Sequence, residues 1–253
     1  MRNLHPIPNS EFEWIDYPGS VLINPGTPDF TKVLESINTS SCLLLIINGE
    51  SFAVEAPDID TYTTIVRQNF QRNGDDIIFN RLNLMAVNNI RIPPLAVVVT
   101  KRDLIPPERR DLIGNIIHAG FSDIFNSGLP VFVSSVTLGE GIEGRADASP
   151  QDVDKPIVYA VLSVLQKSIK DTKSRIEETE RRFREKNTFW NRMFDSNILN
   201  GLQQKIGQDK QIAENLSRNA RSMLDFFDND CIFYEGGIRR NLRDFFAPHF
   251  TVI

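Results

Sequence analysis

The chain has 253 residues, 41% of them hydrophobic, which is enough for one large domain or for a domain with an appended element. Its formal net charge of −5 argues against broad affinity for nucleic acid, and no apolar run approaches the roughly 18 residues that a membrane-spanning helix needs. The two cysteines, Cys42 and Cys231, lie far apart, so we expect no structural disulfide and a reducing, cytoplasmic location.

Strand-like and helix-like patterns alternate over the first two thirds of the chain. Residues 11–16 alternate in polarity, as in an edge or half-covered strand, whereas three later segments are continuously apolar, as in parallel strands covered on both faces: 41–48, 95–100 and 130–135. Helical patterns cover 30–37, 60–87 with an interruption at Gly74, 107–119, and a long segment that opens at Lys155. The sequence therefore predicts an α/β domain over residues 1–165, with a doubly wound, mostly parallel sheet.

After residue 165 the composition becomes highly charged, and apolar residues recur at coiled-coil spacing. They are Ile169, Ile176, Phe183 and Trp190, followed by Leu202, Ile206, Ala213, Leu216, Ala220, Met223 and Phe227. Asn197–Gly201 could contribute to the turn between two helices, and Gly236-Gly237 is a further turn signal. We predict a helical extension over 166–253, in which a hairpin over 166–229 packs on itself, on the α/β domain or on a partner.

The sharpest chemical signal is Thr100-Lys101-Arg102-Asp103, directly after a predicted buried strand. A carboxylate at a strand end can accept two parallel hydrogen bonds from a guanine edge, and a lysine stem can lie over the purine ring. This string resembles the guanine-reading motif Asn/Thr-Lys-x-Asp of P-loop GTPases. The resemblance implies nucleotide-binding roles for Thr100, Lys101 and Asp103.

Two weaker motifs stand in the order that this family shows. Asp16-Tyr17-Pro18-Gly19 is similar to the family's Asp-x-x-Gly, which implies that Asp16 holds Mg²⁺ through water and that the Gly19 N–H meets the γ-phosphate. By itself this motif has little weight, because Asp111–Gly114 matches it inside a predicted helix. Ser134, Ser135 and Val136 resemble the Ser-Ala-Lys loop, whose backbone N–H, here that of Ser135, meets the guanine carbonyl oxygen.

The resemblance covers residues 11–165 and implies GTP or GDP with Mg²⁺ as ligands of an intact parent protein. The WIDYPG stretch and the helical tail are similar to the bacterial double-GTPase type of the translation-factor-related class. No membrane or nucleic-acid partner is expected. The partners implied are a guanine nucleotide and a protein, or a second copy, bound through helices 166–229.

The phosphate-binding string Gly-x-x-x-x-Gly-Lys-Ser/Thr occurs nowhere in the sequence. In the family's strand order, the strand before that string lies beside strand 41–48, and its loss would leave inner sheet edges unpaired. We therefore expect a fragment of a GTPase that binds guanine nucleotides weakly and does not hydrolyse GTP alone. The alternatives are a pseudo-GTPase scaffold that assembles through its C-terminal helices and an unrelated doubly wound enzyme.

Overall fold

The computed structural model describes residues 13, 15–16, 21, 27–88, 90–137, 152–187, 196–227 and 231–251. These residues form two compact units. The first, here called the sheet unit, comprises described residues up to Ala160 together with those of Asn229–Leu242. The second, the helical unit, comprises those of Val161–Asp228 and Arg243–Ile253. The division falls inside the long helix α7, Asp154–Lys186.

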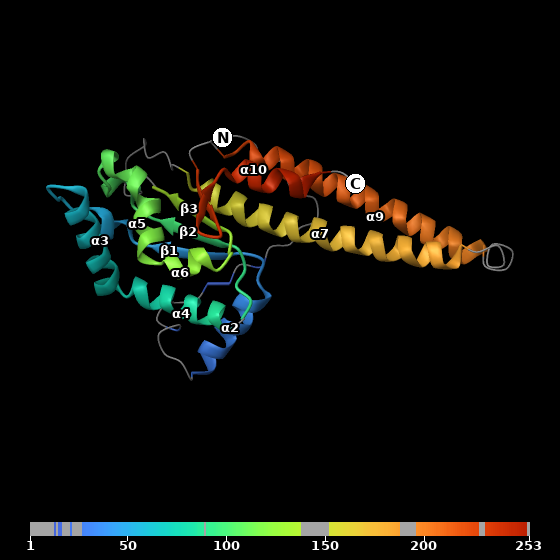
Figure 1. Cartoon of the computed structure of the whole chain (residues 1–253), viewed down its shortest axis with the longest axis horizontal. Coiled ribbons are helices and arrows are strands. Elements are labelled where there is room, and N and C mark those ends of the chain that lie inside the picture. Colours follow the sequence, from blue (N-terminus) through green and yellow to red (C-terminus); the bar gives the residue numbers. More distant parts are fainter. Residues whose placement is uncertain are drawn as a thin grey trace, which may run out of the picture. The chain divides into compact units, whose positions relative to one another are not determined.

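A five-stranded mixed sheet forms the centre of the sheet unit (Figure 1). In sheet order its strands are β1 (Leu43–Ile47), β2 (Leu95–Val99), β3 (Val131–Ser135), β4 (Ile232–Glu235) and β5 (Ile238–Arg240). The first three pair in parallel, β4 is antiparallel to β3, and β5 is antiparallel to β4, so β4 alone runs against the others. The prediction of an α/β fold with a mostly parallel sheet is confirmed.

Short helices connect the strands of this unit. They are α2 (Pro28–Thr39), η1 (Gly49–Phe52), α3 (Ile59–Asn73), α4 (Asp75–Val87), η2 (Arg102–Leu104), η3 (Pro107–Leu112), α5 (Ile113–Gly120) and α6 (Ser122–Asn126). Asp58 caps α3 by accepting the Thr61 N–H at 2.7 Å, and this hydrogen bond holds the pKa of the Asp58 carboxyl below its usual value. Gly74, at φ 79°, ends α3, so the predicted interruption at Gly74 is confirmed.

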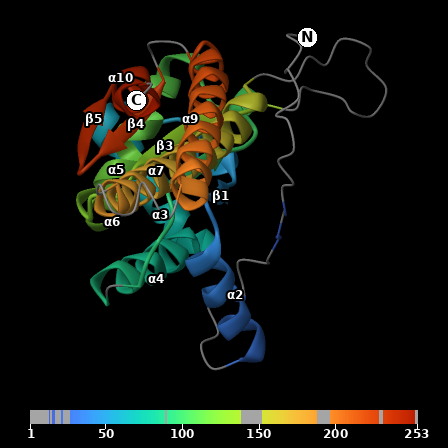
Figure 2. The same cartoon turned by 90° about the vertical axis from the view of Figure 1, so that its right-hand side faces the viewer.

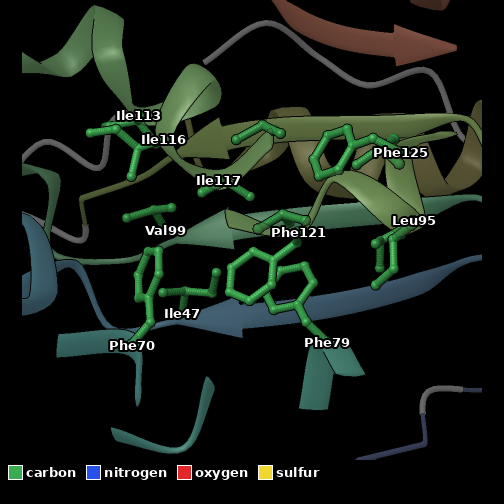
Figure 3. Packing of buried hydrophobic residues seen from close by; sticks show 14 of the residues in the cluster. Ile47, Phe70, Phe79, Leu95, Val99, Ile113, Ile116, Ile117, Phe121 and Phe125 are labelled. Atoms are coloured by element: carbon green, nitrogen blue, oxygen red, sulfur yellow. The ribbon is translucent and has the colours of Figure 1, made fainter. Parts of the chain in front are cut away.

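The main core lies on one face of the sheet, against α2 to α6. Alternate residues of the parallel strands point into it, among them Ile47, Leu95, Val97, Val99, Val131 and Val133. Large aromatic side chains pack against these residues on the same face of the sheet. The rings of Phe79 and Phe121 stack with their centroids 3.6 Å apart (Figure 3). Burial of these side chains is the main stabilising term in the unit.

Side chains also cover the opposite face, at the centre of the sheet. Phe132 of β3 stacks on Tyr159 of α7 with ring centroids 5.0 Å apart, and the Tyr159 hydroxyl donates to the Pro130 carbonyl at 3.2 Å. The first turns of α7 therefore pack on the face that α2 to α6 leave open. A tyrosine placed in this way buries its ring while its hydroxyl keeps a hydrogen-bond partner.

The helical unit contains α7 from Val161 onward and α9 (Ser196–Leu224), which run side by side in Figure 1. Ion pairs join the two helices, Lys210 to Glu180 at 2.9 Å and Arg175 to Asp209 at 3.3 Å. The predicted apolar positions that are buried include Ile169, Ile176, Ala213, Ala220 and Met223, whereas Trp190 lies outside the described residues. Helix α10 (Leu242–Phe246) and η4 (Ala247–Phe250) follow, and a C-terminal helical region is confirmed.

Two strand predictions were wrong. Glu13, Ile15 and Asp16, the described residues of the segment 11–16, belong to no strand and are exposed, because alternation alone provides no neighbouring strand to pair with. The segment 41–48 is not covered on both faces. Its strand β1 is the outermost described strand on that side, and Ile46 is 55% exposed on the face opposite the core.

Two predictions about the C-terminal part were also wrong. Asn197–Gly201 is not a turn but lies within α9, where the neighbouring apolar residues continue the helical pattern. The extension 166–253 is not wholly helical, since β4 and β5 add a hairpin to the sheet, on the side away from β1 (Figure 2). The turn signal at Gly236-Gly237 is confirmed: both residues have positive φ, 56° and 76°, which a two-residue hairpin turn requires.

Candidate functional site

The loops that follow β2 and β3 lie against each other. The Val136 N–H donates to the Val99 carbonyl at 2.8 Å, and the Arg102 N–H donates to the Val136 carbonyl at 3.0 Å. These bonds extend the pairing of the two strands beyond their ends. Residues 100–103 and 134–136 therefore converge at the carboxyl edge of the sheet, meaning the edge at which the parallel strands end. Ligands of open α/β sheets bind at this edge.

Asp103 is exposed at the carboxyl edge and is held from the neighbouring loop. Its Oδ1 accepts a hydrogen bond from the Thr137 hydroxyl at 2.7 Å. Within the described part of the chain, its Oδ2 accepts no hydrogen bond. The carboxylate is thus oriented through one oxygen and open at the other. Thr137 was missed in the sequence analysis, although a hydroxyl residue next to Ser134–Val136 was a signal that could have found it.

Lys101 has a left-handed backbone conformation, φ 52°, which is uncommon for a residue with a side chain. Its ammonium group forms an ion pair with Glu50 of η1, and both side chains are about half exposed. The hydrogen bond from Lys101, followed by that from Asn48, lowers the pKa of the Glu50 carboxyl. Glu50 was also missed, because it lies 51 residues before Lys101 and no local pattern connects them.

The loop after β1 packs tightly against the loop after β2. The Thr100 N–H and hydroxyl both donate to the Ile47 carbonyl, at 2.9 and 3.2 Å. A Cβ atom built at Gly49 would lie 1.9 Å from the Thr100 carbonyl oxygen, far inside the contact distance. Only glycine fits at this position without moving the backbone. The position of the 100–103 loop is therefore fixed from both neighbouring strands.

The start of α7 is attached to the same edge. Arg102 forms an ion pair with Asp152, and the Lys155 ammonium lies 2.9 Å from the other oxygen of Asp152. Basic and acidic side chains therefore alternate around the carboxyl edge rather than forming a patch of one sign. This balance is unsuited to non-specific binding of polyanions and suits a site in which single charges meet particular ligand groups.

The remaining predicted site residues have different surroundings. Ser134 and Val136 are buried, at 7% and 6% exposed, and Ser135 is half-buried at the end of β3. Gly19 lies outside the described residues. Asp16 is described and exposed, and no group of three or more His, Cys, Asp or Glu residues in the described ranges could hold a metal ion. The structure therefore brings together Thr100–Asp103 and Ser134–Val136.

Comparison with known protein families, curated proteins and solved structures finds no match to this chain. Among the helices in the described ranges, none has the length and apolar character to cross a membrane. A function has to be inferred from the chemistry of the carboxyl edge itself. The groups available there are an oriented carboxylate, a lysine stem and the backbone of two adjoining loops.

Proposed function

We propose that the chain binds guanine nucleotides at the carboxyl edge of the sheet and that Asp103 reads the base. A guanine presents two adjacent donors, the N1–H and the exocyclic amine. A carboxylate accepts from both at once, and such charge-assisted bidentate pairs are stronger than neutral hydrogen bonds. The observation that carries the proposal is the state of Asp103: Thr137 holds it through Oδ1, which can still accept a second hydrogen bond, and Oδ2 accepts none from the described residues.

The same carboxylate would reject adenine. Adenine has an acceptor at N1 where guanine has a donor, so its Watson–Crick edge faces the carboxylate with a lone pair. Binding would then desolvate Asp103 without satisfying it, which typically costs at least 1–3 kcal/mol, roughly a tenfold to hundredfold loss of affinity. Specificity for guanine therefore follows from a single exposed side chain, provided that its orientation is fixed. Thr137 supplies that orientation.

Lys101 provides the second contact in this proposal. Its ammonium group is engaged by Glu50, so its aliphatic stem is restrained near the loop rather than free in solvent. An alkyl stem of this kind can cover one face of a purine while the charged end stays in water. Because the Val136 N–H is bonded to the Val99 carbonyl, the neighbouring Ser135 N–H points away from β2, and we assign it no contact with the base.

The proposal is limited to binding. The sequence contains no Gly-x-x-x-x-Gly-Lys-Ser/Thr string, whose amides and lysine would hold the β- and γ-phosphates. We therefore assign no hydrolysis of GTP to this chain, and we expect the base and ribose to supply most of the affinity. The affinity should then be weak and similar for GTP and GDP.

The test is a binding series with the full chain, GDP, ADP and XDP, measured by calorimetry or by ligand-observed NMR. The wild-type chain should prefer GDP over ADP by about tenfold or more. In the Asp103→Asn variant the amide presents a donor where the carboxylate presents an acceptor. Preference should move from guanine to xanthine, whose additional carbonyl accepts that donor.

Asp111→Asn is a matched control, because Asp111 is an exposed aspartate in η3 and not part of the site. This variant should still bind GDP more tightly than XDP or ADP, as the wild-type chain is expected to do. If wild-type protein binds GDP and ADP equally, or if Asp103→Asn keeps the guanine preference, Asp103 does not read a base and the proposal is wrong.

The alternative function is a scaffold that assembles through helices 166–229. The apolar seam between those helices gives this alternative less support. Ile169 and Ile176 of α7 and Ala213 and Ala220 of α9 are buried within the chain, each at no more than 4% exposed. A seam that is already covered offers no surface to another copy unless the hairpin opens. Assembly by this route would therefore require unpacking the helical unit.

A further inference from the structure

The two edges of the sheet are built differently. The outer strand on one side, β5, carries Arg239 and Arg240, and all three of its residues are exposed. Charged side chains on an edge strand oppose pairing with another chain. The outer described strand on the other side, β1, has the sequence Leu-Leu-Leu-Ile-Ile, without a charge or a proline, and pairs with β2 in unbroken register. Strand β1 therefore lacks the charged side chains that oppose the pairing of β5 with another chain.

The outward-facing backbone groups of β1 follow from its pairing with β2. The Leu43 N–H donates to the Pro94 carbonyl and the Ile47 carbonyl accepts from the Thr100 N–H, both at 2.9 Å. Because successive residues of a strand point their N–H and C=O groups to opposite sides, those of Leu44 and Ile46 point away from β2. No described strand pairs with them there. Unmet backbone groups in an apolar strand favour the addition of another strand.

We propose that β1 pairs in an antiparallel manner with β1 of a second copy of this chain, around a two-fold axis at Leu45. In this register Leu44 lies opposite the partner's Ile46, and Ile46 lies opposite the partner's Leu44. Each of these pairs exchanges two N–H to C=O hydrogen bonds, so the outward groups of one copy satisfy the same groups of the other. The β1 edge of one copy is therefore complementary to the β1 edge of the other, as an isologous interface requires.

Side chains and charges favour a second copy over a different chain. Ile46 is 55% exposed on the face opposite the core, and in the proposed register it lies beside the partner's Leu44 on the same face. The residues that flank the strand, Cys42 and Asn48, also carry no formal charge. Two copies therefore approach without repulsion between like charges at the strand, although the whole chain is acidic.

Sedimentation velocity of the full chain over a wide concentration range tests the association. Wild-type protein should form a dimer, and Ile46→Lys should weaken it by about tenfold or more, because a lysine would be desolvated against the partner's Leu44. Ile238→Lys is the matched control: Ile238 is 56% exposed in β5 on the other edge, and its replacement should leave the dimer intact. A wild-type chain that stays monomeric, or a dimer that Ile46→Lys leaves unchanged, would overturn the proposal.

Amide hydrogen exchange followed by NMR tests the register. Protection of the Leu44 and Ile46 amides should increase with protein concentration, whereas the Leu45 amide, which faces β2, should be protected at every concentration. Protection of Leu44 and Ile46 that does not depend on concentration would mean that another segment occupies the edge, and would equally overturn the proposal. Neither experiment uses a nucleotide, so the result does not depend on guanine binding.

Discussion

The sheet unit and the helical unit bury polar side chains in different proportions. The core cluster of the sheet unit consists of aliphatic and aromatic residues, with Tyr62 and Tyr234 as its members that carry a hydroxyl. Among the described residues, the helical unit buries five polar side chains, those of Ser163, Thr172, Thr179, Asp209 and Ser217, whereas the larger sheet unit buries three, those of Ser51, Ser134 and Thr137. Apolar packing stabilises without strong directional demands, whereas every buried polar group needs a partner. The helical unit therefore depends on hydrogen bonds to buried polar groups to a greater extent, for its size, than the sheet unit does.

The polar groups of the helical unit differ in how well they are satisfied. Thr172 and Thr179 donate to carbonyls of their own helix, those of Ser168 and Arg175, each at 2.8 Å. Asp209 meets Arg175 through one oxygen, and its other oxygen, like the Ser217 hydroxyl, has no hydrogen bond within the described ranges. We interpret the contact between Asp209 of α9 and Arg175 of α7 as fixing how the two helices align, at a cost in free energy of unfolding.

The largest effect expected from this contrast is the loss of an aromatic ring from the sheet unit. Phe79 is 1% exposed and stacks on Phe121, so Phe79→Ala should lower the free energy of unfolding by about 3–5 kcal/mol. Leu84→Ala in the same helix is the control, since Leu84 is 51% exposed and its loss should cost under about 1 kcal/mol. Urea denaturation would measure both. Equal losses in the two variants would show that this core is loosely packed.

A tight backbone contact should give the next effect. Gly49→Ala places a Cβ atom 1.9 Å from the Thr100 carbonyl oxygen, which forces the loops after β1 and β2 apart and should cost roughly 1–3 kcal/mol. Gly120→Ala is the matched change, because nothing lies within 4 Å of its added Cβ, and it should be neutral or slightly stabilising. Thermal unfolding of the pair measures the difference. If both variants melt together, Gly49 does not fix the 100–103 loop.

The sequence predicted those parts of the structure that depend on local patterns. Apolar runs located the parallel strands, Gly74 located the break between α3 and α4, and seven-residue spacing located Ile169 and Ile176 in the buried seam. Local patterns did not reveal β4, of which three residues pair with β3 about a hundred residues earlier, as Tyr234 does with Val131. The exposure of Ile46 was missed for a related reason, since the composition of a strand does not specify its neighbours.

The candidate site was predictable to a similar extent. The string Thr100–Asp103 and the stretch Ser134–Val136 were predicted to contribute to one guanine site, and the hydrogen bond from the Arg102 N–H to the Val136 carbonyl brings their backbones together. Thr137 and Glu50, which hold Asp103 and Lys101, belong to the same edge but were not predicted. Their contacts span 34 and 51 residues of sequence, so only the fold brings them to the motif. Guanine binding stays a prediction.

The smallest effect should come from the helical unit and should have the opposite sign. Ser217 is 1% exposed and its hydroxyl has no hydrogen bond among the described residues. The Ser217→Ala variant therefore removes a buried polar group whose desolvation no hydrogen bond offsets. The free energy of unfolding should stay constant or rise by up to about 1 kcal/mol.

Thr172→Val is the comparison, because the Thr172 hydroxyl donates to the Ser168 carbonyl and accepts from Arg175 at 3.2 Å. Loss of these bonds should lower the free energy of unfolding by about 1 kcal/mol. Chemical denaturation of the two variants beside wild type measures both signs. If Ser217→Ala were destabilising by as much as Thr172→Val, the Ser217 hydroxyl would have a hydrogen-bond partner in solution, and the two buried hydroxyls would not differ as the structure indicates.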